Sequence, residues 1–172
     1  LLSLVLDQYG HILVSNKPQK MSALIINKFS DIEKYNIETL IRFFVNQPVW
    51  CADFLEKILS SRFQIHFNIH VVDYNQPAPK RSQKSQETCK KLCDIFLQLS
   101  LSLSKTSESQ KWTSKTLQIL KHPFAIYDID QALIISKQHN FSEGFLYLYE
   151  KMGFYNEIIS YYSKLKDVDQ LI

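Results

Sequence analysis

Glycine, proline and cysteine are scarce in this sequence of 172 residues, which has only three glycines, five prolines and three cysteines. Folds built from many short strands need glycine or proline in their tight turns. The low count therefore disfavours an all-β protein and favours helix. The odd number of cysteines, without framework spacing, does not fit a disulfide-stapled domain and indicates a reducing compartment.

Long apolar runs and a strong net charge are also missing. No run of about 18 apolar residues occurs, so the sequence predicts no membrane-spanning helix. The apolar start, Leu1–Leu6, has neither a basic leader nor a cleavage site and is interpreted as a truncated helix, not a signal peptide. The chain lacks an initiator methionine and stops at Ile172 inside a helical pattern, which suggests a fragment.

The net charge of +3 is too small to indicate a nucleic-acid-binding or membrane-binding face. The densest basic zone contains Lys80, Arg81, Lys84, Lys90 and Lys91. A solvated linker followed by a helix start explains this zone best, and contact with lipid or nucleic acid is the alternative.

Apolar residues account for 45% of the sequence and charged residues for 22%, which is typical of a globular protein. In residues 131–172 they recur at helical spacing in three segments, which are separated by breaks at His139–Asn140, Met152–Gly153 and Lys164–Lys166. The segments also echo each other, since Phe141, Tyr155 and Val168 occupy equivalent positions. This repetition predicts antiparallel helices stacked as a solenoid.

Helical patterns also occur upstream, with proline as the first residue of two predicted helices. The predicted helices are Leu1–Tyr9, ending near Gly10, then Pro18–Phe29, Asn36–Val45, Pro48–Leu59, Gln86–Leu103 and Glu108–Lys121. Pro123 ends the last of these, and Asp128 or Asp130 caps the helix that follows an apolar connector.

One stretch departs from the helical pattern. Apolar and polar residues alternate from Arg62 to Asp73, which favours an extended strand, although a helix remains an equal alternative. Tyr74–Ser85 has the composition of a linker. His66 and His70 share one face of either structure, but without a third ligand they are interpreted as solvent-facing residues, not as a metal site.

The cysteines and the C-terminal glutamates are interpreted as structural residues and not as a metal site or catalytic acids. Cys89 and Cys93 lie one helical turn apart but lack the further ligands of a zinc site, so they and Cys51 are interpreted as buried structural thiols. Glu143, Glu150 and Glu157 recur every seven residues and are interpreted as a solvated stripe, not as catalytic acids.

Gly144 is expected inside a helix where two helices approach closely. The C-terminal tyrosines are assigned mainly to core packing, with a binding face as the alternative; they are Tyr147, Tyr149, Tyr155, Tyr161 and Tyr162. The sequence predicts no catalytic, cofactor-binding or metal-binding residue.

The run HNFSEGFLYLYE, preceded by ALIISKQ and followed by GFYNEIISYYSK, closely resembles the clathrin-heavy-chain-repeat region of the vacuolar protein sorting-associated protein eleven family. The segments DQYGHILVSNKPQKMSALIINKFSD and PVWCADFLEKIL resemble this family more weakly, and residues 60–85 have no counterpart in it.

This resemblance implies an all-α fold, an α-solenoid of antiparallel helix hairpins of the clathrin-heavy-chain-repeat or TPR-like kind, with an inserted linker. The expected organisation is helical hairpins over residues 1–60, an inserted extended segment and linker over 61–85, and continuing solenoid over 86–172, with the clathrin-type repeat at 131–172.

The resemblance further implies a non-enzymatic scaffold in a subunit shared by the HOPS and CORVET membrane-tethering complexes. The expected partners are the other subunits and, indirectly, Rab GTPases and SNAREs, on the cytoplasmic face of endosome and vacuole or lysosome membranes. No cofactor or nucleic acid is expected. The alternatives are the solenoid of another coat or tethering protein, such as clathrin heavy chain, and a helical regulatory domain of an enzyme.

Overall fold

The structure is a computed structural model that describes residues 2–27, 37–44, 46–67, 77, 79–106 and 108–165, with side chains described from residue 8 in the first range and from residue 40 in the second. All the regular elements in these ranges are α-helices, which confirms the predicted all-α fold. They are α1 (Leu2–Asn16), α2 (Pro18–Asn27), α4 (Ile37–Arg42), α5 (Pro48–Phe63), α6 (Gln83–Leu103), α7 (Ser109–Lys121), α8 (Ile129–Gln138), α9 (Ser142–Met152) and α10 (Tyr155–Leu165).

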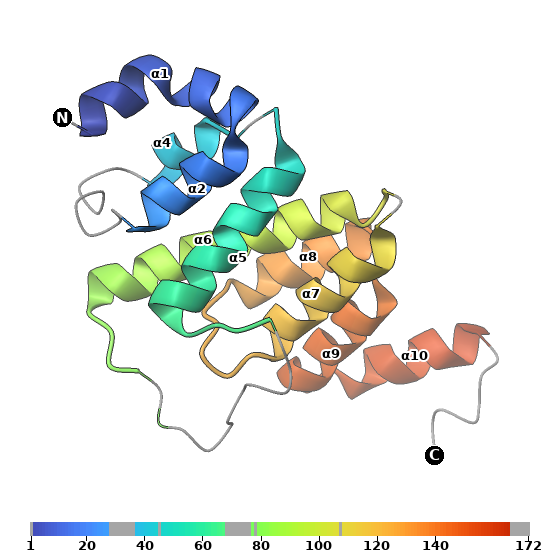
Figure 1. Cartoon of the computed structure of the whole chain (residues 1–172). Helices are drawn as coiled ribbons and strands as arrows, with labels where there is room; N and C mark the ends of the chain where they lie inside the picture. Colours follow the sequence, from blue (N-terminus) through green and yellow to red (C-terminus); the bar gives the residue numbers. More distant parts are fainter. Residues whose placement is uncertain are drawn as a thin grey trace.

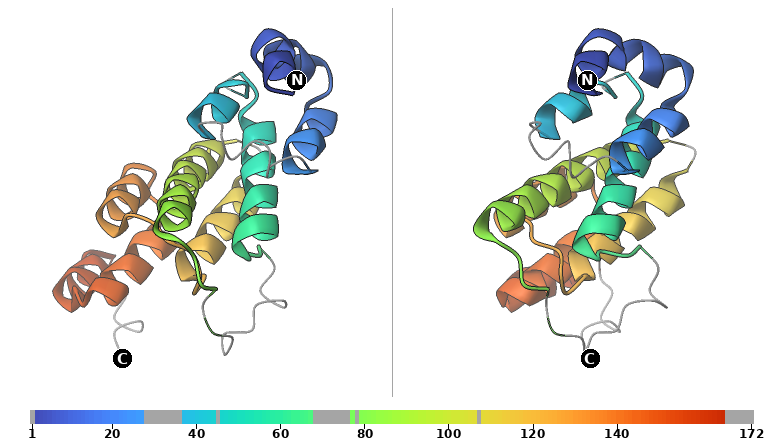
Figure 2. Two further views of the ribbon diagram at one scale, coloured as in Figure 1. Left: turned by 90° about the vertical axis from the view of Figure 1, so that its left-hand side faces the viewer. Right: turned by 60° about the vertical axis from the view of Figure 1, so that its left-hand side comes forward.

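Helices α1, α2 and α4 lie at one end of the molecule, α5 to α8 in the middle, and α9 and α10 at the other end (Figure 1). Sequential neighbours pack as pairs: α1 with α2, α6 with α7, and α8 with α9. The second and third of these pairs also stack on each other, because α6 contacts α8 and α7 contacts α9. Figure 2 shows this stack from two further sides, with α8 beside α6 on the side away from α5. Stacked helix pairs are the predicted α-solenoid.

Local sequence signals set most of the helix ends. Pro18 and Pro48 are the first residues of α2 and α5, as predicted. The Asp128 side chain accepts a hydrogen bond from the Gln131 N–H and caps α8. Gly153 adopts a φ of 74° after the last residue of α9, a left-handed conformation that costs glycine little.

Four predicted boundaries were wrong. The helix predicted to extend to Val45 ends at Arg42, and Phe43 and Phe44 form a turn. The first helix does not end near Gly10, because α1 continues through it to Asn16. The helix that begins at Pro48 continues to Phe63, so Arg62 and Phe63 are helical and do not begin a strand. The linker does not extend to Ser85, because α6 begins at Gln83 and its N-cap Ser82 accepts a hydrogen bond from the Ser85 N–H.

The stretch predicted as a strand is only partly described. Gln64 ends α5 in a left-handed conformation with φ of 54°, and Gln64–Phe67 form neither strand nor helix. Residues 68–76 and 78 lie outside the described ranges, as do residues 28–36 and 166–172, where other predicted helix ends and caps fall.

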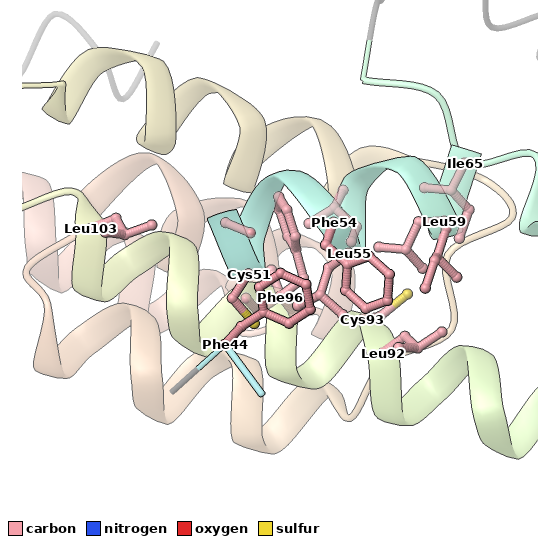
Figure 3. Close-up of a cluster of buried hydrophobic side chains, with 14 of the residues drawn as sticks. Phe44, Cys51, Phe54, Leu55, Leu59, Ile65, Leu92, Cys93, Phe96 and Leu103 are labelled. Atoms are coloured by element: carbon pink, nitrogen blue, oxygen red, sulfur yellow. The ribbon is translucent and has the colours of Figure 1, made fainter. Parts of the chain in front are cut away.

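The core is centred on α5 and α6, whose apolar faces meet across the middle of the molecule (Figure 3). The Phe44 ring, in the turn before α5, stacks on the Phe54 ring with centroids 4.9 Å apart. Several of the largest side chains in this core are almost fully buried: Phe44, Phe54, Phe96 and Trp112. Each such side chain contributes about 1.5–3 kcal/mol by burial, so this region stabilises the middle of the stack.

Candidate interaction surface

The three cysteines are buried in the core, and none forms a disulfide bond. Burial raises the pKa of the Cys51 thiol to about 12. A hydrogen bond with Cys93 lowers the pKa of Cys89 to about 7, with a smaller contribution from the positive charge of Arg81. Across the described ranges, no three side chains of histidine, cysteine, aspartate or glutamate gather as metal ligands would.

Arg81 is not part of a solvated linker, and its predicted role was wrong. Its guanidinium donates hydrogen bonds to the carbonyl oxygens of Phe63, at the end of α5, and Phe124, in the connector between α7 and α8. It also donates to Sγ of Cys89 over 3.4 Å and lies 5.4 Å from the centre of the Phe63 ring. Arg81 therefore joins three segments that lie far apart in the sequence.

His122 is a buried histidine that the sequence patterns did not reveal. The backbone N–H of His66 lies 3.3 Å from its Nε2, and the N–H of Phe124 lies 3.1 Å from its Nδ1. Burial, with the charges of His66 and Arg81, lowers the pKa of His122 to about 4. The imidazole is therefore neutral at neutral pH and accepts one of these two N–H groups, since its other ring nitrogen carries the proton. The His66 side chain is exposed as predicted, and His70 lies outside the described ranges.

The connector between α7 and α8 is held by side-chain hydrogen bonds. The Asp128 N–H donates to Oδ1 of Asp94 on α6 over 2.8 Å, and Lys90 forms an ion pair with the Asp128 carboxylate at 3.0 Å. The Tyr127 hydroxyl donates to the Leu120 carbonyl and accepts from Nζ of Lys151 on α9. These bonds fix the α8–α9 pair against α6 and α7.

A groove of about 530 Å³ runs along the outer face of α9, between α7 and α10. We call it the aromatic groove. It is lined by Leu117 and Lys121 from α7, Glu143, Leu146, Tyr147 and Glu150 from α9, and Tyr155, Ile158 and Tyr162 from α10. Apolar and aromatic side chains form most of its wall, and the two carboxylates lie two helical turns apart along α9.

Helix α10 has no buried side chain and extends away from the stack (Figure 1). It is held to α9 by ring contacts, such as that between Tyr161 and Phe145 at 5.2 Å. Some of its apolar side chains are exposed, with exposed fractions of 61% for Tyr155 and 51% for Ile159. The aromatic groove and this outer face form a continuous apolar surface, since Tyr155 belongs to both.

A second groove, of about 760 Å³, lies between α2, α5 and α7. Its walls include charges of both signs, and the Glu56 carboxylate and the Lys115 ammonium form an ion pair across it. This pair links α5 to α7. Since its walls carry both signs of charge and two of these charges already pair with each other, the second groove is a weaker candidate for recognising a partner than the aromatic groove.

The residue pattern and its fold match a known family. The family model described as PEP5/VPS11 clathrin repeat matches residues 2–172. The chain belongs to the PEP5/VPS11 clathrin-repeat family. This confirms the resemblance on which the predicted solenoid was based.

Curated relatives agree with this assignment. The chain is 33% identical over 135 residues to the vacuolar protein sorting-associated protein 11 homolog of Dictyostelium discoideum. These residues make up 78% of this chain and 12% of the relative. It is 36% identical over 96 residues to the vacuolar protein-sorting-associated protein 11 homolog of Arabidopsis thaliana. These residues make up 56% of this chain and 9% of the relative. The chain thus spans about a tenth of the length of these relatives. No solved structure matches it significantly.

In this clathrin-repeat chain, the predicted acidic stripe and tyrosines take part in the candidate surface. Glu143, Glu150 and Glu157 are all exposed, as predicted, and the first two line the aromatic groove. Tyr149 is buried, as expected of a core residue, whereas Tyr147, Tyr161 and Tyr162 are half-buried and Tyr155 is exposed. None of the described helices combines the length and apolarity needed to cross a membrane.

Proposed function

We propose that this chain is a scaffold segment of a subunit shared by the HOPS and CORVET endolysosomal tethering complexes. The observation that carries the proposal is the match of the whole described chain to the PEP5/VPS11 clathrin repeat. The names of two relatives, which refer to vacuolar protein sorting, support it.

The scaffold acts mechanically. Stacked helix pairs form a stiff rod, because each pair is packed against the next through buried side chains. A rod of this kind holds partner subunits at a fixed separation while the complex bridges two membranes. The subunits bind Rab GTPases and cooperate with SNAREs, so this chain contacts those proteins only indirectly. It associates peripherally with the cytoplasmic face of endosome and vacuole or lysosome membranes through the complex, and it performs no catalysis.

Affinity purification of the full-length protein from its own cells, followed by mass spectrometry, tests this proposal. Recovery of the other HOPS and CORVET subunits is the expected result. Recovery of clathrin light chains in their place would assign the repeat to a coat protein. Recovery of the subunits of an enzyme would identify the chain as a helical regulatory domain.

A further inference from the structure

The aromatic groove has the form of a site for a helix. Its floor is one face of α9, formed by Glu143, Leu146, Tyr147 and Glu150, which recur three, four and seven residues apart. Its walls come from α7 and α10, on either side of this face. A hydrophobic groove between helices is the surface into which an amphipathic helix lays its apolar face.

The charge of the aromatic groove indicates the chemistry of its occupant. Glu143 and Glu150 are exposed, and neither has a hydrogen-bonded or ion-paired side-chain partner among the described residues. Lys121 is the one cation among the described residues that line the groove, and it lies over the Tyr147 ring at 5.6 Å. The groove therefore presents two unpaired carboxylates beside an apolar floor, which complements a partner with positive charge.

The spacing of these carboxylates restricts the partner further. Seven residues of α-helix span about 10.5 Å, so Glu143 and Glu150 are two turns apart on the same face of α9. A partner helix lying along α9 matches both when its own basic residues are seven positions apart. Its apolar residues, three or four positions apart, then face Leu146 and Ile158.

We propose that the aromatic groove binds an amphipathic helix of another protein, with Lys or Arg residues seven positions apart flanking an apolar stripe. Under the proposed scaffold function, this helix belongs to another subunit of the tethering complex, so the inference deepens that function. The aromatic rings supply apolar contact area at low entropic cost, and the two carboxylates set the register of the bound helix.

Site-specific photo-crosslinking in the full-length protein, in its own cells, tests the inference. The probe is p-benzoylphenylalanine in place of Tyr155, at the groove edge. The control carries the same probe in place of Phe154, which is 46% exposed but does not line the groove. We expect the Tyr155 probe to capture a peptide of another protein with the basic spacing described above. Capture of this chain's own residues, of a second copy, or of a peptide without basic residues would overturn the inference, as would a yield no higher than that of the control.

Charge reversal provides the second measurement. The double variant Glu143→Lys with Glu150→Lys is expected to lower the crosslinking yield about tenfold, because two attractive pairs become repulsive. Glu157→Lys reverses another exposed acid, which does not line the groove, and is expected to change the yield less than about twofold. Reversing the two basic residues of the captured peptide should restore the yield of the double variant. An unchanged yield in the double variant, or no restoration, would overturn the inference.

These outcomes are separate from those that test the scaffold function. If the wild-type protein recovers no tethering subunits, the proposed function fails, while the captured peptide still decides the chemistry of the groove. If it recovers them but the Tyr155 probe captures no basic helix, only the groove inference fails.

Discussion

The guanidinium of Arg81 donates a 2.9 Å hydrogen bond to the carbonyl oxygen of Phe124. Arg81 precedes α6 and Phe124 follows α7, so this bond joins the start of the α6–α7 pair to its end. A second bond from the same guanidinium reaches the carbonyl of Phe63, the last residue of α5. A planar guanidinium can satisfy several carbonyl groups at once, which a lysine ammonium on its flexible stem does less well. Arg81 therefore positions three segments relative to one another.

Replacing Arg81 should destabilise the protein. Hydrogen bonds to a charged group are each worth about 1.5–3 kcal/mol, so we expect Arg81→Ala to lower the free energy of unfolding by about 3 kcal/mol. In a chain of this size, that loss corresponds to a decrease in Tm of about 6–12 °C. Thermal and urea unfolding followed by circular dichroism measure it.

The neighbouring cation gives a matched control. Lys80 is exposed, so Lys80→Ala should change stability by less than about 0.5 kcal/mol. Arg81→Lys, which keeps the charge but loses the fork of donors, should lie between wild type and Arg81→Ala. Equal stability of Arg81→Ala and Lys80→Ala would show that the bridge contributes nothing.

Gly144 leaves room for the ring of the residue that precedes its helix. A Cβ added at Gly144 would lie 2.3 Å from Cδ1 of the Phe141 side chain, which is buried at the start of α9. The atoms nearest to this Cβ belong to the Phe141 ring and not to a second helix, so the helix–helix approach predicted at Gly144 is not confirmed. Although alanine gains about 1 kcal/mol over glycine in helix propensity, we expect Gly144→Ala to destabilise the protein by about 1–3 kcal/mol through overpacking.

A smaller residue at position 141 should relieve this clash. In a Phe141→Leu background, Gly144→Ala should cost less than half of what it costs in the wild type, as measured by urea unfolding. Gly153→Ala is a contrasting variant, because nothing lies within 4 Å of its added Cβ and only its left-handed φ of 74° is strained. That strain should cost about 1–2 kcal/mol whatever residue occupies position 141. An identical cost of Gly144→Ala in both backgrounds would contradict the ring-contact explanation.

Local signals account for the parts of the fold that were predicted from sequence. Proline at the first helical position, the Asp128 cap and Gly153 act within a few residues of themselves, so Pro18, Pro48 and the ends of α8 and α9 were placed correctly. The periodicity of α9 and α10 similarly predicted stacked helices.

Contacts between distant residues account for the errors. Gly10 was expected to end a helix, but α1 continues through it. A Cβ added at Gly10 would lie only 2.7 Å from the Phe43 ring, so this glycine allows the ring to pack against α1. The partners of Arg81 are 18 and 43 residues away, and no local pattern encodes them. The seven-residue spacing of the acids was visible in the sequence, but their place in a groove depends on how α7 and α10 pack around α9.

The ion pair between Glu56 and Lys115 should couple α5 to α7. Both side chains are mostly buried, with exposed fractions of 25% and 18%, so solvent screens their attraction less than at the surface. In a double-mutant cycle with alanine at each position, we expect a coupling energy of about 1–2 kcal/mol. Urea unfolding of the four proteins measures it.

A surface pair serves as the comparison for that cycle. Glu108 and Lys111 form an exposed ion pair at 2.9 Å, three residues apart. Their coupling energy should be less than about 0.5 kcal/mol, as is typical of surface pairs. If the two cycles gave the same coupling, burial of the Glu56–Lys115 pair would have no energetic effect.

His122 should make the stability of the protein depend on pH below neutrality. In the folded state its pKa is lowered to about 4, whereas an unfolded histidine has a pKa near 6.5. Both ring nitrogens face backbone N–H donors, so a protonated ring has no acceptor to bind. Between these two pKa values the unfolded chain binds a proton that the folded chain does not. Stability contributed by His122 is therefore present above about pH 6.5 and is lost as the pH falls toward 4.

The free energy of unfolding should consequently decrease by about 1.4 kcal/mol for each pH unit between about 6.5 and 4, in addition to the contribution of other groups. Urea unfolding at a series of pH values measures this slope. In His122→Asn the slope over this range should be smaller by the same amount, because the titrating group is gone. His66→Gln should keep most of the wild-type slope, since burial and not the charge of His66 is the main cause of the lowered pKa of His122. If His122→Asn kept the wild-type slope, another group would have to be the origin of the acid sensitivity, and the neutral buried imidazole would not be its cause.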